Sequence, residues 1–351
     1  MDKFVINGPN KVKGSINVSG SKNAALPILA ATLLFDKPVE IKNLPNVKDI
    51  ETMLNLLRSL GSKVITSRDK KSARIINSKK VKTYAAYSLV KTMRAGILVL
   101  GPLISKYKKA TVSMPGGCNL GTRPINFHLN ALRKLNMNYK IKKGYVHAFI
   151  KKKLIGKKIK FPKISVGATE NLIIASTFAK GVTILKNCAI EPEVKDLVNF
   201  LNLAGANLKW VGKRTLHIKG VNSLKSISYS IIGDRIETGT WCVLAALSEG
   251  KLKIRGFNFK LIQTELNLLK KIGVKIKFNN NNEIEVKGSK EIKNINLTTK
   301  EYPAFPTDLQ AQFMVLLCKA RGRSIIKENI FENRFMHVAE LRRLGAKIKI
   351  K

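Results

Sequence analysis

The sequence is poor in the residues that build metal sites, disulfide frameworks and aromatic surfaces. Its 351 residues include 4 cysteines, 4 histidines and 7% aromatic residues. None of the cysteines forms a C-x-x-C pair, so we expect neither a structural zinc site nor a disulfide frame. Cys242 and Cys318 lie inside apolar helical patterns, which predict small buried side chains, and Cys188 follows a predicted strand.

The sequence also lacks an apolar run long enough to cross a bilayer. The longest runs, such as residues 97–104, fall far short of the roughly 20 residues that a membrane helix needs. The first residues, MDKF, lack the basic-then-apolar design of a signal peptide. The hydrophobic fraction of 44% is enough to bury a large core, and the length suits about two domains. These features favour a globular protein of the cytoplasm.

Acidic residues are scarce, with 22 Asp and Glu against 65 Lys and Arg, which gives a net charge of +43. Such an excess is typical of proteins that bind nucleic acid. The basic residues, however, are mostly lysines spread from Lys3 to Lys351, and asparagine and isoleucine are abundant too. We therefore interpret the charge as compositional drift towards A- and T-rich codons rather than as a nucleic-acid footprint. Its field would still attract anionic small molecules.

A helix end followed by a strand recurs about every seventy residues. The position after the helix is suited to a C-cap with left-handed backbone. It is occupied in turn by Gly61, Asn136, Gly205, Gly273 and Gly345.

In phase with this signal, an apolar helix leads into a β-branched strand, as in residues 173–187 and 243–256. Each unit therefore reads strand, helix, strand, helix, strand, strand. One helix is almost wholly apolar and should be buried, whereas the other, such as residues 49–60, is amphipathic and should face solvent. The fifth copy ends in a single predicted strand, residues 346–350, without its hairpin partner.

The apolar helices open with small, hydroxyl, amide and basic residues. These openings are residues 19–23, 91–94, 165–169, 234–238 and 306–308. Each alone is an ordinary N-cap. Together they place helix N-termini, with Lys22 and Arg94, at equivalent repeat positions that suit phosphate or carboxylate. A Walker loop and a dinucleotide fingerprint are both absent from the sequence, which disfavours ordinary ATPases and Rossmann dehydrogenases.

The most distinctive segment is PGGCNLGTRP, residues 115–124, whose glycines and prolines predict a surface loop. Cys118 close to Arg123 is either a reactive thiol of lowered pKa or an incidental exposed cysteine. Asp308 stands beside a helix start, where an aspartate is normally a cap. Residues 331–337 form a dense polar and aromatic turn.

These segments resemble, in order and spacing, the enolpyruvyl transferases, and the resemblance runs from Met1 to the last residue. It implies an α/β fold, a two-domain inside-out barrel of six βαβαββ repeats, of which five are present. One domain, residues 22–231, would carry the Cys118 loop. Residues 1–21 and 232–351 would form the second, incomplete domain. Because the family's sixth repeat supplies an aspartate and an arginine that contacts phosphoenolpyruvate, we expect lower stability and weakened or absent activity.

The resemblance implies transfer of the enolpyruvyl group of phosphoenolpyruvate to the 3′-hydroxyl of UDP-N-acetylglucosamine, with release of phosphate. This is the entry step of peptidoglycan synthesis, and it implies no metal or organic cofactor. Lys22 would contact phosphoenolpyruvate, Cys118 would donate a proton to the enol methylene or form an adduct, and Asp308 would act as base for the 3′-hydroxyl. The Cys118 loop would close over the bound nucleotide.

The substrate contacts implied by the family fall on Lys22, Asn23, Arg94, Arg123, Pro124, Ile125, Asn126, Phe127, Lys163, Ile164, Ser165, Val166, Gly167, Asp308, Ile330 and Arg334. Two alternatives remain. One is transfer to shikimate 3-phosphate, which the Cys118 loop and the 331–337 turn disfavour. The other is an inactive remnant or a basic protein that binds nucleic acid.

Overall fold

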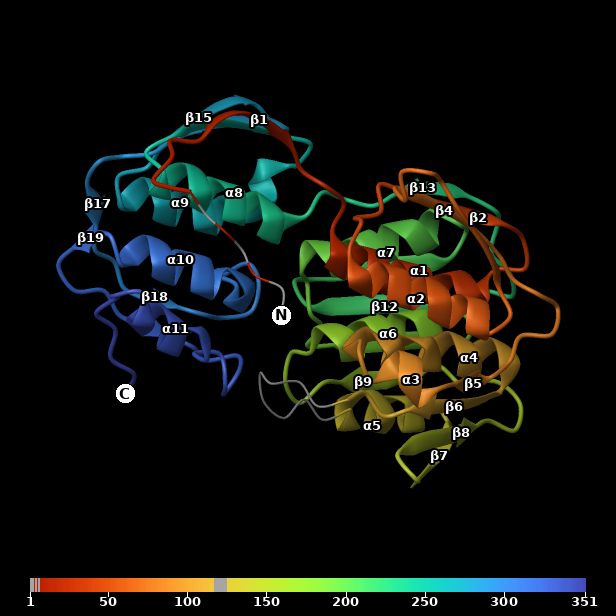
Figure 1. The fold of residues 1–351 in the computed structure, drawn as a ribbon. Helices are drawn as coiled ribbons and strands as arrows, with labels where there is room; N and C mark the ends of the chain where they lie inside the picture. Colours follow the sequence, from red (N-terminus) through yellow and green to blue (C-terminus); the bar gives the residue numbers. More distant parts are fainter. Residues whose placement is uncertain (1–2, 4, 6, 117–124) are drawn as a thin grey trace. The chain divides into compact units, whose positions relative to one another are not determined.

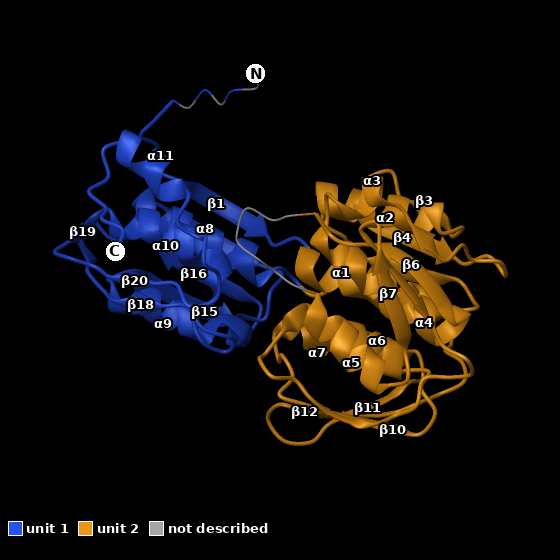
Figure 2. Ribbon diagram, turned by 90° about the horizontal axis from the view of Figure 1, so that it is seen from below, with its two compact units in different colours: residues 1–19, 233–351 blue, residues 20–232 orange. Residues whose placement is uncertain are grey.

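A computed structural model describes residues 3, 5, 7–116 and 125–351 (Figure 1). It consists of two compact units (Figure 2). Unit 1 is formed by residues 1–19 and 233–351, and unit 2 by residues 20–232. The chain thus leaves unit 1 after Ser19 and returns to it after Ile232.

Unit 2 contains three four-stranded sheets with one pairing scheme. In each, an outer strand pairs in parallel with the next, and the other two pairings are antiparallel. The first sheet is β13 (Ser228–Ser230), β2 (Val39–Lys42), β4 (Ser72–Ile76) and β3 (Lys63–Thr66). The second is β5 (Tyr84–Ala85), β6 (Lys109–Ser113), β8 (Tyr145–Phe149) and β7 (Asn138–Lys142). The third is β9 (Lys158–Lys160), β10 (Val182–Lys186), β12 (Thr215–Lys219) and β11 (Asn207–Trp210).

The helices of unit 2 pack on one another and on the inner faces of these sheets. They are α1 (Lys22–Ala31), the 3-10 helix η1 (Thr32–Leu34), α2 (Lys48–Ser59), α3 (Tyr87–Val90), the 3-10 helix η2 (Arg94–Val99), α4 (Leu100–Tyr107), α5 (Asn126–Lys134), α6 (Val166–Ser176) and α7 (Pro192–Leu203). Strands such as β4 and β8 alternate between buried and more exposed residues, so the outer sheet faces meet solvent. Helices inside and sheets outside are the inside-out arrangement that the family resemblance implies.

The two helix types are also confirmed. Helix α1 is buried from Ala24 to Ala31, as its apolar composition requires. Helix α2 buries Met53 and Leu57 while it exposes Glu51 and Arg58, so one face of this amphipathic helix meets solvent.

The predicted left-handed helix ends are present in all five repeats. The φ angles are 100° at Gly61, 77° at Asn136, 95° at Gly205, 105° at Gly273 and 95° at Gly345. A positive φ turns the chain directly from the helix into the following strand, which explains why the residue choice at this position is restricted.

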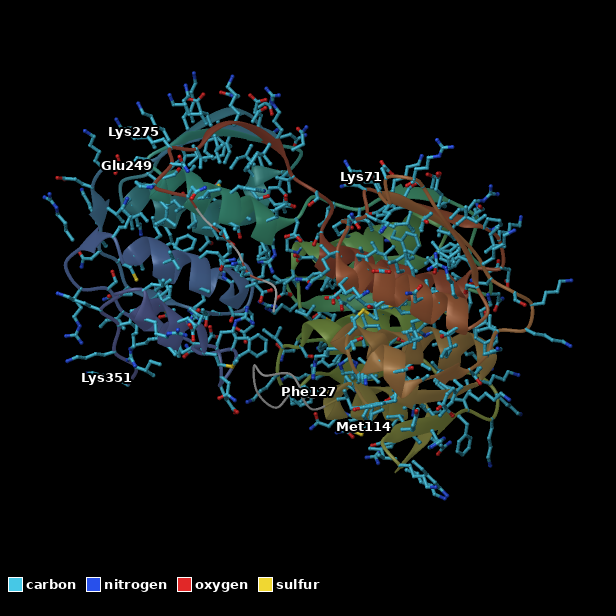
Figure 3. All side chains as sticks on the ribbon, viewed as in Figure 1. Lys71, Met114, Phe127, Glu249, Lys275 and Lys351 are labelled. Atoms are coloured by element: carbon cyan, nitrogen blue, oxygen red, sulfur yellow. The ribbon has the colours of Figure 1, made fainter. Side chains whose placement is uncertain are left out.

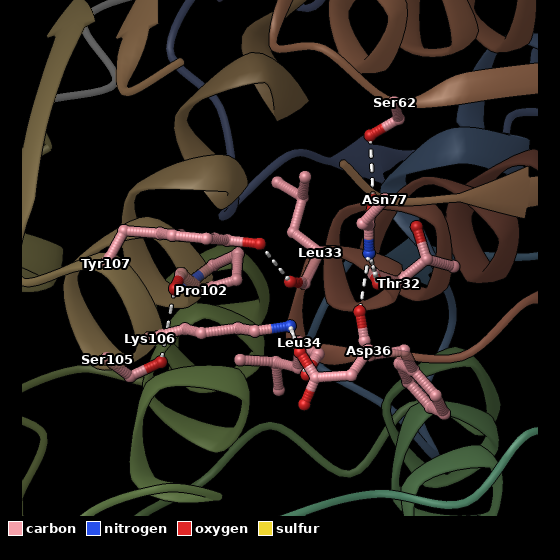
Figure 4. A network of polar contacts seen from close by, with 11 residues as sticks. Thr32, Leu33, Leu34, Asp36, Ser62, Asn77, Pro102, Ser105, Lys106 and Tyr107 are labelled. Atoms are coloured by element: carbon pink, nitrogen blue, oxygen red, sulfur yellow. Dashed lines mark hydrogen bonds and ion pairs between the residues drawn. The ribbon is translucent and has the colours of Figure 1, made fainter. Parts of the chain in front are cut away.

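Side-chain contacts join the first and second repeats of unit 2 (Figure 4). The amide of Asn77 donates to the carbonyls of Thr32, at 2.7 Å, and Phe35, at 2.9 Å, where α1 ends. Lys106, in α4, donates to the Leu34 carbonyl at 3.0 Å and pairs with Asp36 at 2.8 Å. The carbonyls at the end of one central helix are therefore satisfied by side chains from neighbouring elements.

Unit 1 has one four-stranded sheet and two short strand pairs. The sheet is β1 (Lys13–Asn17), β14 (Lys251–Arg255), β16 (Glu283–Lys287) and β15 (Lys275–Asn280). The pairs are β17 (Ile292–Lys293) with β19 (Ala320–Arg321), and β18 (Leu297–Thr298) with β20 (Ile326–Lys327). The helices are α8 (Arg235–Leu247), η3 (Phe259–Ile262), α9 (Gln263–Lys271), η4 (Thr307–Leu309), α10 (Gln310–Leu317) and α11 (His337–Arg343).

Two predictions for unit 1 are wrong. Residues 346–350 do not form a strand, because a strand needs a hydrogen-bonding partner and no described segment pairs with this one. The Ile348 carbonyl instead accepts from the Arg342 side chain at 2.7 Å. Cys318 is exposed rather than buried, because α10 ends at Leu317 and the chain turns away from the core.

The basic side chains of the described residues are spread over many segments. In Figure 3 nitrogen-tipped side chains project from both units, and Lys71, Lys275 and Lys351 extend from three separate segments. Within the described parts of the chain, no helix combines the length and the apolar character that a membrane span needs.

Candidate active site

The predicted phosphoenolpyruvate contacts lie at the start of α1. Ser21 is the N-cap, and its hydroxyl accepts from the backbone N–H of Ala24 at 3.3 Å. The Lys22 ammonium lies 3.1 Å from the Asp49 carboxylate, and their side chains are 42% and 36% exposed. An ion pair this exposed is weak, so it orients Lys22 without holding it firmly. Asn23 is half-buried beside it.

Arg94 opens η2 and is half-buried. Burial first, and the charge of Arg94 second, lower the pKa of His128 in the first turn of α5. The structure thus brings a residue predicted for the nucleotide sugar to a second helix start in unit 2.

The starts of α5 and α6 hold further predicted contacts. Ile125 is buried in the core, Asn126 is exposed, and Phe127 is half-buried against that core. Lys163 and Val166 are exposed, and Ile164 and Gly167 are half-buried. The hydroxyl of Ser165 caps α6 by accepting from the Ala168 N–H at 3.3 Å. The two helices pack together, and Gly167 in the first turn of α6 lies against His128 in the first turn of α5, so both groups of residues lie at adjacent helix starts.

Three predicted site residues, Cys118, Arg123 and Pro124, lie outside the described residues.

One buried polar pair of unit 2 was missed by sequence reasoning. The Nδ1 atom of His128, in the first turn of α5, lies 3.1 Å from the Nδ2 atom of Asn171 in α6. Burial, followed by the charge of Arg94, lowers the pKa of His128 to about 3. The imidazole is therefore neutral near pH 7.

In unit 1, the structure brings together Asp308 and Arg334, which lie 26 residues apart. Nη2 of Arg334 donates a hydrogen bond to Oδ1 of Asp308, at a distance of 2.8 Å. The guanidinium also lies 5.5 Å from the centroid of the Phe331 ring. Asp308 is therefore an ion-pair partner, whereas the N-cap of η4 is Pro306.

Glu328 organises the turn that holds Ile330, and sequence reasoning missed it as well. Its carboxylate accepts from the hydroxyls of Thr299 and Thr307, both at 2.9 Å. It also accepts from the backbone N–H groups of Ile330, at 2.8 Å, and Phe331, at 3.1 Å. A carboxylate with four donors fixes the turn, because each charge-assisted bond must be broken to move it.

The remaining predicted helix start belongs to α8. The Asp234 carboxylate accepts from the N–H groups of Ile236, at 2.7 Å, and Glu237, at 3.0 Å. Glu237 in turn accepts from the Ser19 N–H at 3.1 Å, which fastens the exit of β1 to this helix. The described residues contain no group of three or more His, Cys, Asp or Glu side chains placed to hold a metal ion.

Comparison with known proteins identifies relatives of the whole chain. The profile of a family described as EPSP synthase (3-phosphoshikimate 1-carboxyvinyltransferase) matches residues 6–351. A UDP-N-acetylglucosamine 1-carboxyvinyltransferase of Pelagibacter ubique (strain HTCC1062) is 64% identical over 350 residues, covering 100% of this chain and 83% of the relative. Its counterpart in Coxiella burnetii (strain Dugway 5J108-111) is 46% identical over 351 residues, covering 100% and 80%.

Solved structures share the fold. The enolpyruvyl transferase NikO from Streptomyces tendae superposes with a TM-score of 0.88 at 21% identity, covering 99% of this chain and 82% of that one. An EPSP synthase from Acinetobacter baumannii gives a TM-score of 0.73 at 17% identity, covering 95% and 78%. The predicted inside-out α/β fold is therefore confirmed. With a family profile that matches nearly every residue and relatives of this identity, the chain belongs to the EPSP synthase family of enolpyruvyl transferases.

Proposed function

We propose that this chain transfers the enolpyruvyl group of phosphoenolpyruvate to the 3′-hydroxyl of UDP-N-acetylglucosamine and releases phosphate. The observation that carries the proposal is the 64% identity, across the whole chain, to a relative named for carboxyvinyl transfer to this nucleotide sugar. The reaction would begin peptidoglycan synthesis in the cytoplasm. Through that product it would serve cell-wall biogenesis, cell shape and cell division.

The chemistry requires an acid and a base. Protonation of the methylene carbon of phosphoenolpyruvate makes its C2 atom electrophilic, and the 3′-hydroxyl oxygen bonds to C2 as the hydroxyl loses its proton. Loss of a proton from the methyl group formed in this way, and of phosphate, then restores the double bond in the product. We assign the acid to Cys118, which could also form an adduct with phosphoenolpyruvate, and the base to Asp308.

The contact between Asp308 and Arg334 supports the second assignment. A carboxylate held at 2.8 Å by a mostly buried guanidinium has a fixed orientation and keeps its second oxygen for another partner. Lys22, Asn23 and Arg123 would bind phosphoenolpyruvate, because its phosphate and carboxylate are anionic.

The helix starts of unit 2 supply the proposed nucleotide-sugar contacts. Arg94 and Lys163 bring positive charge to the starts of η2 and α6, where backbone N–H groups are directed outward. The other contacts are Pro124, Ile125, Asn126, Phe127, Ile164, Ser165, Val166 and Gly167, with Ile330 from unit 1.

Shikimate 3-phosphate is the second candidate acceptor, because the matching family profile is described by carboxyvinyl transfer to a phosphoshikimate. Phosphate release from phosphoenolpyruvate decides between the two. We expect release that saturates with UDP-N-acetylglucosamine and none above background with shikimate 3-phosphate. Turnover with shikimate 3-phosphate alone would overturn the proposal. Salt-dependent DNA binding without binding of the nucleotide sugar would instead favour a nucleic-acid-binding protein.

A further inference from the structure

A neutral histidine in the first turn of α5 is linked to α6 and η2 of unit 2. The Asn171 side chain, which is fully buried in α6, has an amide nitrogen with two hydrogens. That nitrogen lies 3.1 Å from His128 Nδ1 in α5 and donates to the Ile97 carbonyl in η2 at 3.1 Å. The amide nitrogen of Asn171 can only donate, so Nδ1 of the neutral His128 accepts and its Nε2 carries the hydrogen. Helices α5 and α6 and helix η2 are thus linked through one amide.

The imidazole ring also sets the distance between two helix starts. A methyl group added at Gly167, in the first turn of α6, would lie 3.3 Å from Cε1 and 3.4 Å from Nε2 of His128. The ring is 5% exposed and therefore fills the space between the first turns of α5 and α6. A smaller or differently shaped side chain would change how closely those turns approach.

The other repeats of unit 2 show that packing alone does not require a histidine here. At the same distance from the left-handed helix end, α2 carries Met53 and α7 carries Leu197, both fully buried. An apolar side chain therefore completes the equivalent helix contact. Replacing both partners of a buried hydrogen bond by apolar groups of the same shape can be neutral for stability or stabilising, so the pair between His128 and Asn171 points to a role in the site.

We propose that His128 is a positioning residue that holds the proposed nucleotide-sugar contacts of η2, α5 and α6 at fixed spacing. The inference rests on the proposed function, because residues 94, 125–127 and 163–167 are assigned to UDP-N-acetylglucosamine there. His128 reaches α6 through Asn171 and Gly167, and η2 through Asn171, and it acts on substrate through these helices.

Calorimetric titration with UDP-N-acetylglucosamine tests this on the full chain. We expect His128→Leu, which keeps bulk but loses the acceptor and the ring, to raise the Kd at least tenfold. His128→Asn keeps an acceptor at the Nδ1 position and should give a smaller rise. The matched control is Met53→Leu, a buried substitution at the equivalent position of the first repeat, which should leave the Kd within twofold.

Steady-state kinetics separates positioning from a general loss of structure. In both His128 variants the KM for UDP-N-acetylglucosamine should rise in the same order as the Kd values, more in His128→Leu than in His128→Asn, while the KM for phosphoenolpyruvate stays within twofold. An unchanged Kd in His128→Leu, an equal rise in Met53→Leu, or a parallel rise of both KM values would overturn the inference. Wild-type protein that binds the nucleotide sugar without releasing phosphate would refute the proposed function alone, and the Kd comparison would still decide the role of His128.

Discussion

At the scale of single residues, the cysteines of the chain differ in the environment of their thiols. Burial raises the pKa of Cys188 and of Cys242 to about 12, so neither is a thiolate near pH 7. Burial also raises the pKa of Cys318, although its side chain is exposed. None of these three has the environment of a reactive cysteine, which leaves Cys118 as the candidate.

Fosfomycin, an epoxide that resembles phosphoenolpyruvate, should therefore alkylate Cys118 selectively. We expect one adduct in the intact mass, formed faster in the presence of UDP-N-acetylglucosamine, with peptide mapping that assigns it to Cys118. Cys118→Ala should remain unlabelled, and Cys318→Ala is the control that should react as wild type. Labelling of Cys318 or Cys188 would remove Cys118 from the proposed mechanism.

The ion pair of unit 1 gives a second residue-scale prediction. Asp308→Ala should lower kcat by about 10² to 10⁴, the usual contribution of general acid–base catalysis, in an assay of phosphate release. Arg334→Ala should lower kcat because Asp308 loses its orienting donor, and Arg334→Lys should recover part of the loss. Asp69→Ala, at an exposed turn of unit 2, is the matched control. Full activity of Asp308→Ala would contradict its assignment as the base.

The resemblance identified Asp308 and Arg334 separately, but the sequence could not show that they touch. Their contact depends on the parallel pairing of β18 with β20, which brings segments about thirty residues apart side by side. Glu328 was missed for a similar reason. A glutamate after a strand is usually solvated, and only the folded chain places two threonine hydroxyls and two backbone N–H groups around it.

At the scale of elements, helix ends were more predictable than strands. The left-handed residue after each helix is a local requirement, which glycine or asparagine satisfies in any context, so all five positions were found from the sequence. The strand predicted at residues 346–350 failed because strand formation depends on a partner elsewhere in the chain. The role of His128 could have been found by comparing the repeats, since α2 and α7 carry apolar residues at the same position.

Asn136 is the non-glycine member of the left-handed set, at φ 77°, and it provides a test of this rule. Asn136→Gly should change the free energy of unfolding by less than about 1 kcal/mol, because lower strain offsets greater unfolded-chain entropy. Asn136→Ala should destabilise by about 1 kcal/mol, since a Cβ disfavours this backbone without the local hydrogen bonding of asparagine. Asn130→Ala, in the exposed part of α5, should instead stabilise by about 0.5 kcal/mol. Equal effects in chemical denaturation at the two asparagines would contradict the prediction.

At the scale of the whole molecule, long-range contacts close each unit. In unit 2, β13 completes the sheet of β2 from a point almost 190 residues along the chain, as shown by the pairing of Ser228 with Glu40. The Tyr229 hydroxyl in this strand donates to Asp196 in α7 at 2.5 Å. The sequence predicted the repeats but not this contact, because it joins different repeats.

Asp196 makes the stability of unit 2 dependent on pH. Burial is the main cause that raises its pKa from 3.8 to about 6, and the Tyr229 hydrogen bond opposes this. Because the folded pKa lies above the unfolded pKa, the stabilisation from proton binding is fully present below about pH 4. It is lost as pH rises through about 6. The shift corresponds to about 3 kcal/mol.

Chemical denaturation between pH 4 and pH 7 measures this effect. As pH rises from 4 to 7, the wild type should lose about 3 kcal/mol of unfolding free energy relative to Asp196→Asn, because asparagine does not ionise. Asp69→Asn is the control of opposite sign, because hydrogen bonding from Ser67 lowers the pKa of Asp69. Its stabilising contribution is lost as pH falls. A pH-independent difference between Asp196→Asn and wild type would contradict the prediction.

The pairing of β1 with β14 also imposes an order on folding during translation. Strand β1 is synthesised early, but its residue Lys13 pairs with Lys251 in β14. The strand therefore has no partner until β14 has left the ribosome. By then every described strand of unit 2, including β13, has already been made. Unit 2 is therefore expected to fold while it is still tethered to the ribosome. The first strand of unit 1 must remain unpaired through that interval, when its lysine-rich sequence, KGSIN preceded by NKV, helps to keep it hydrated.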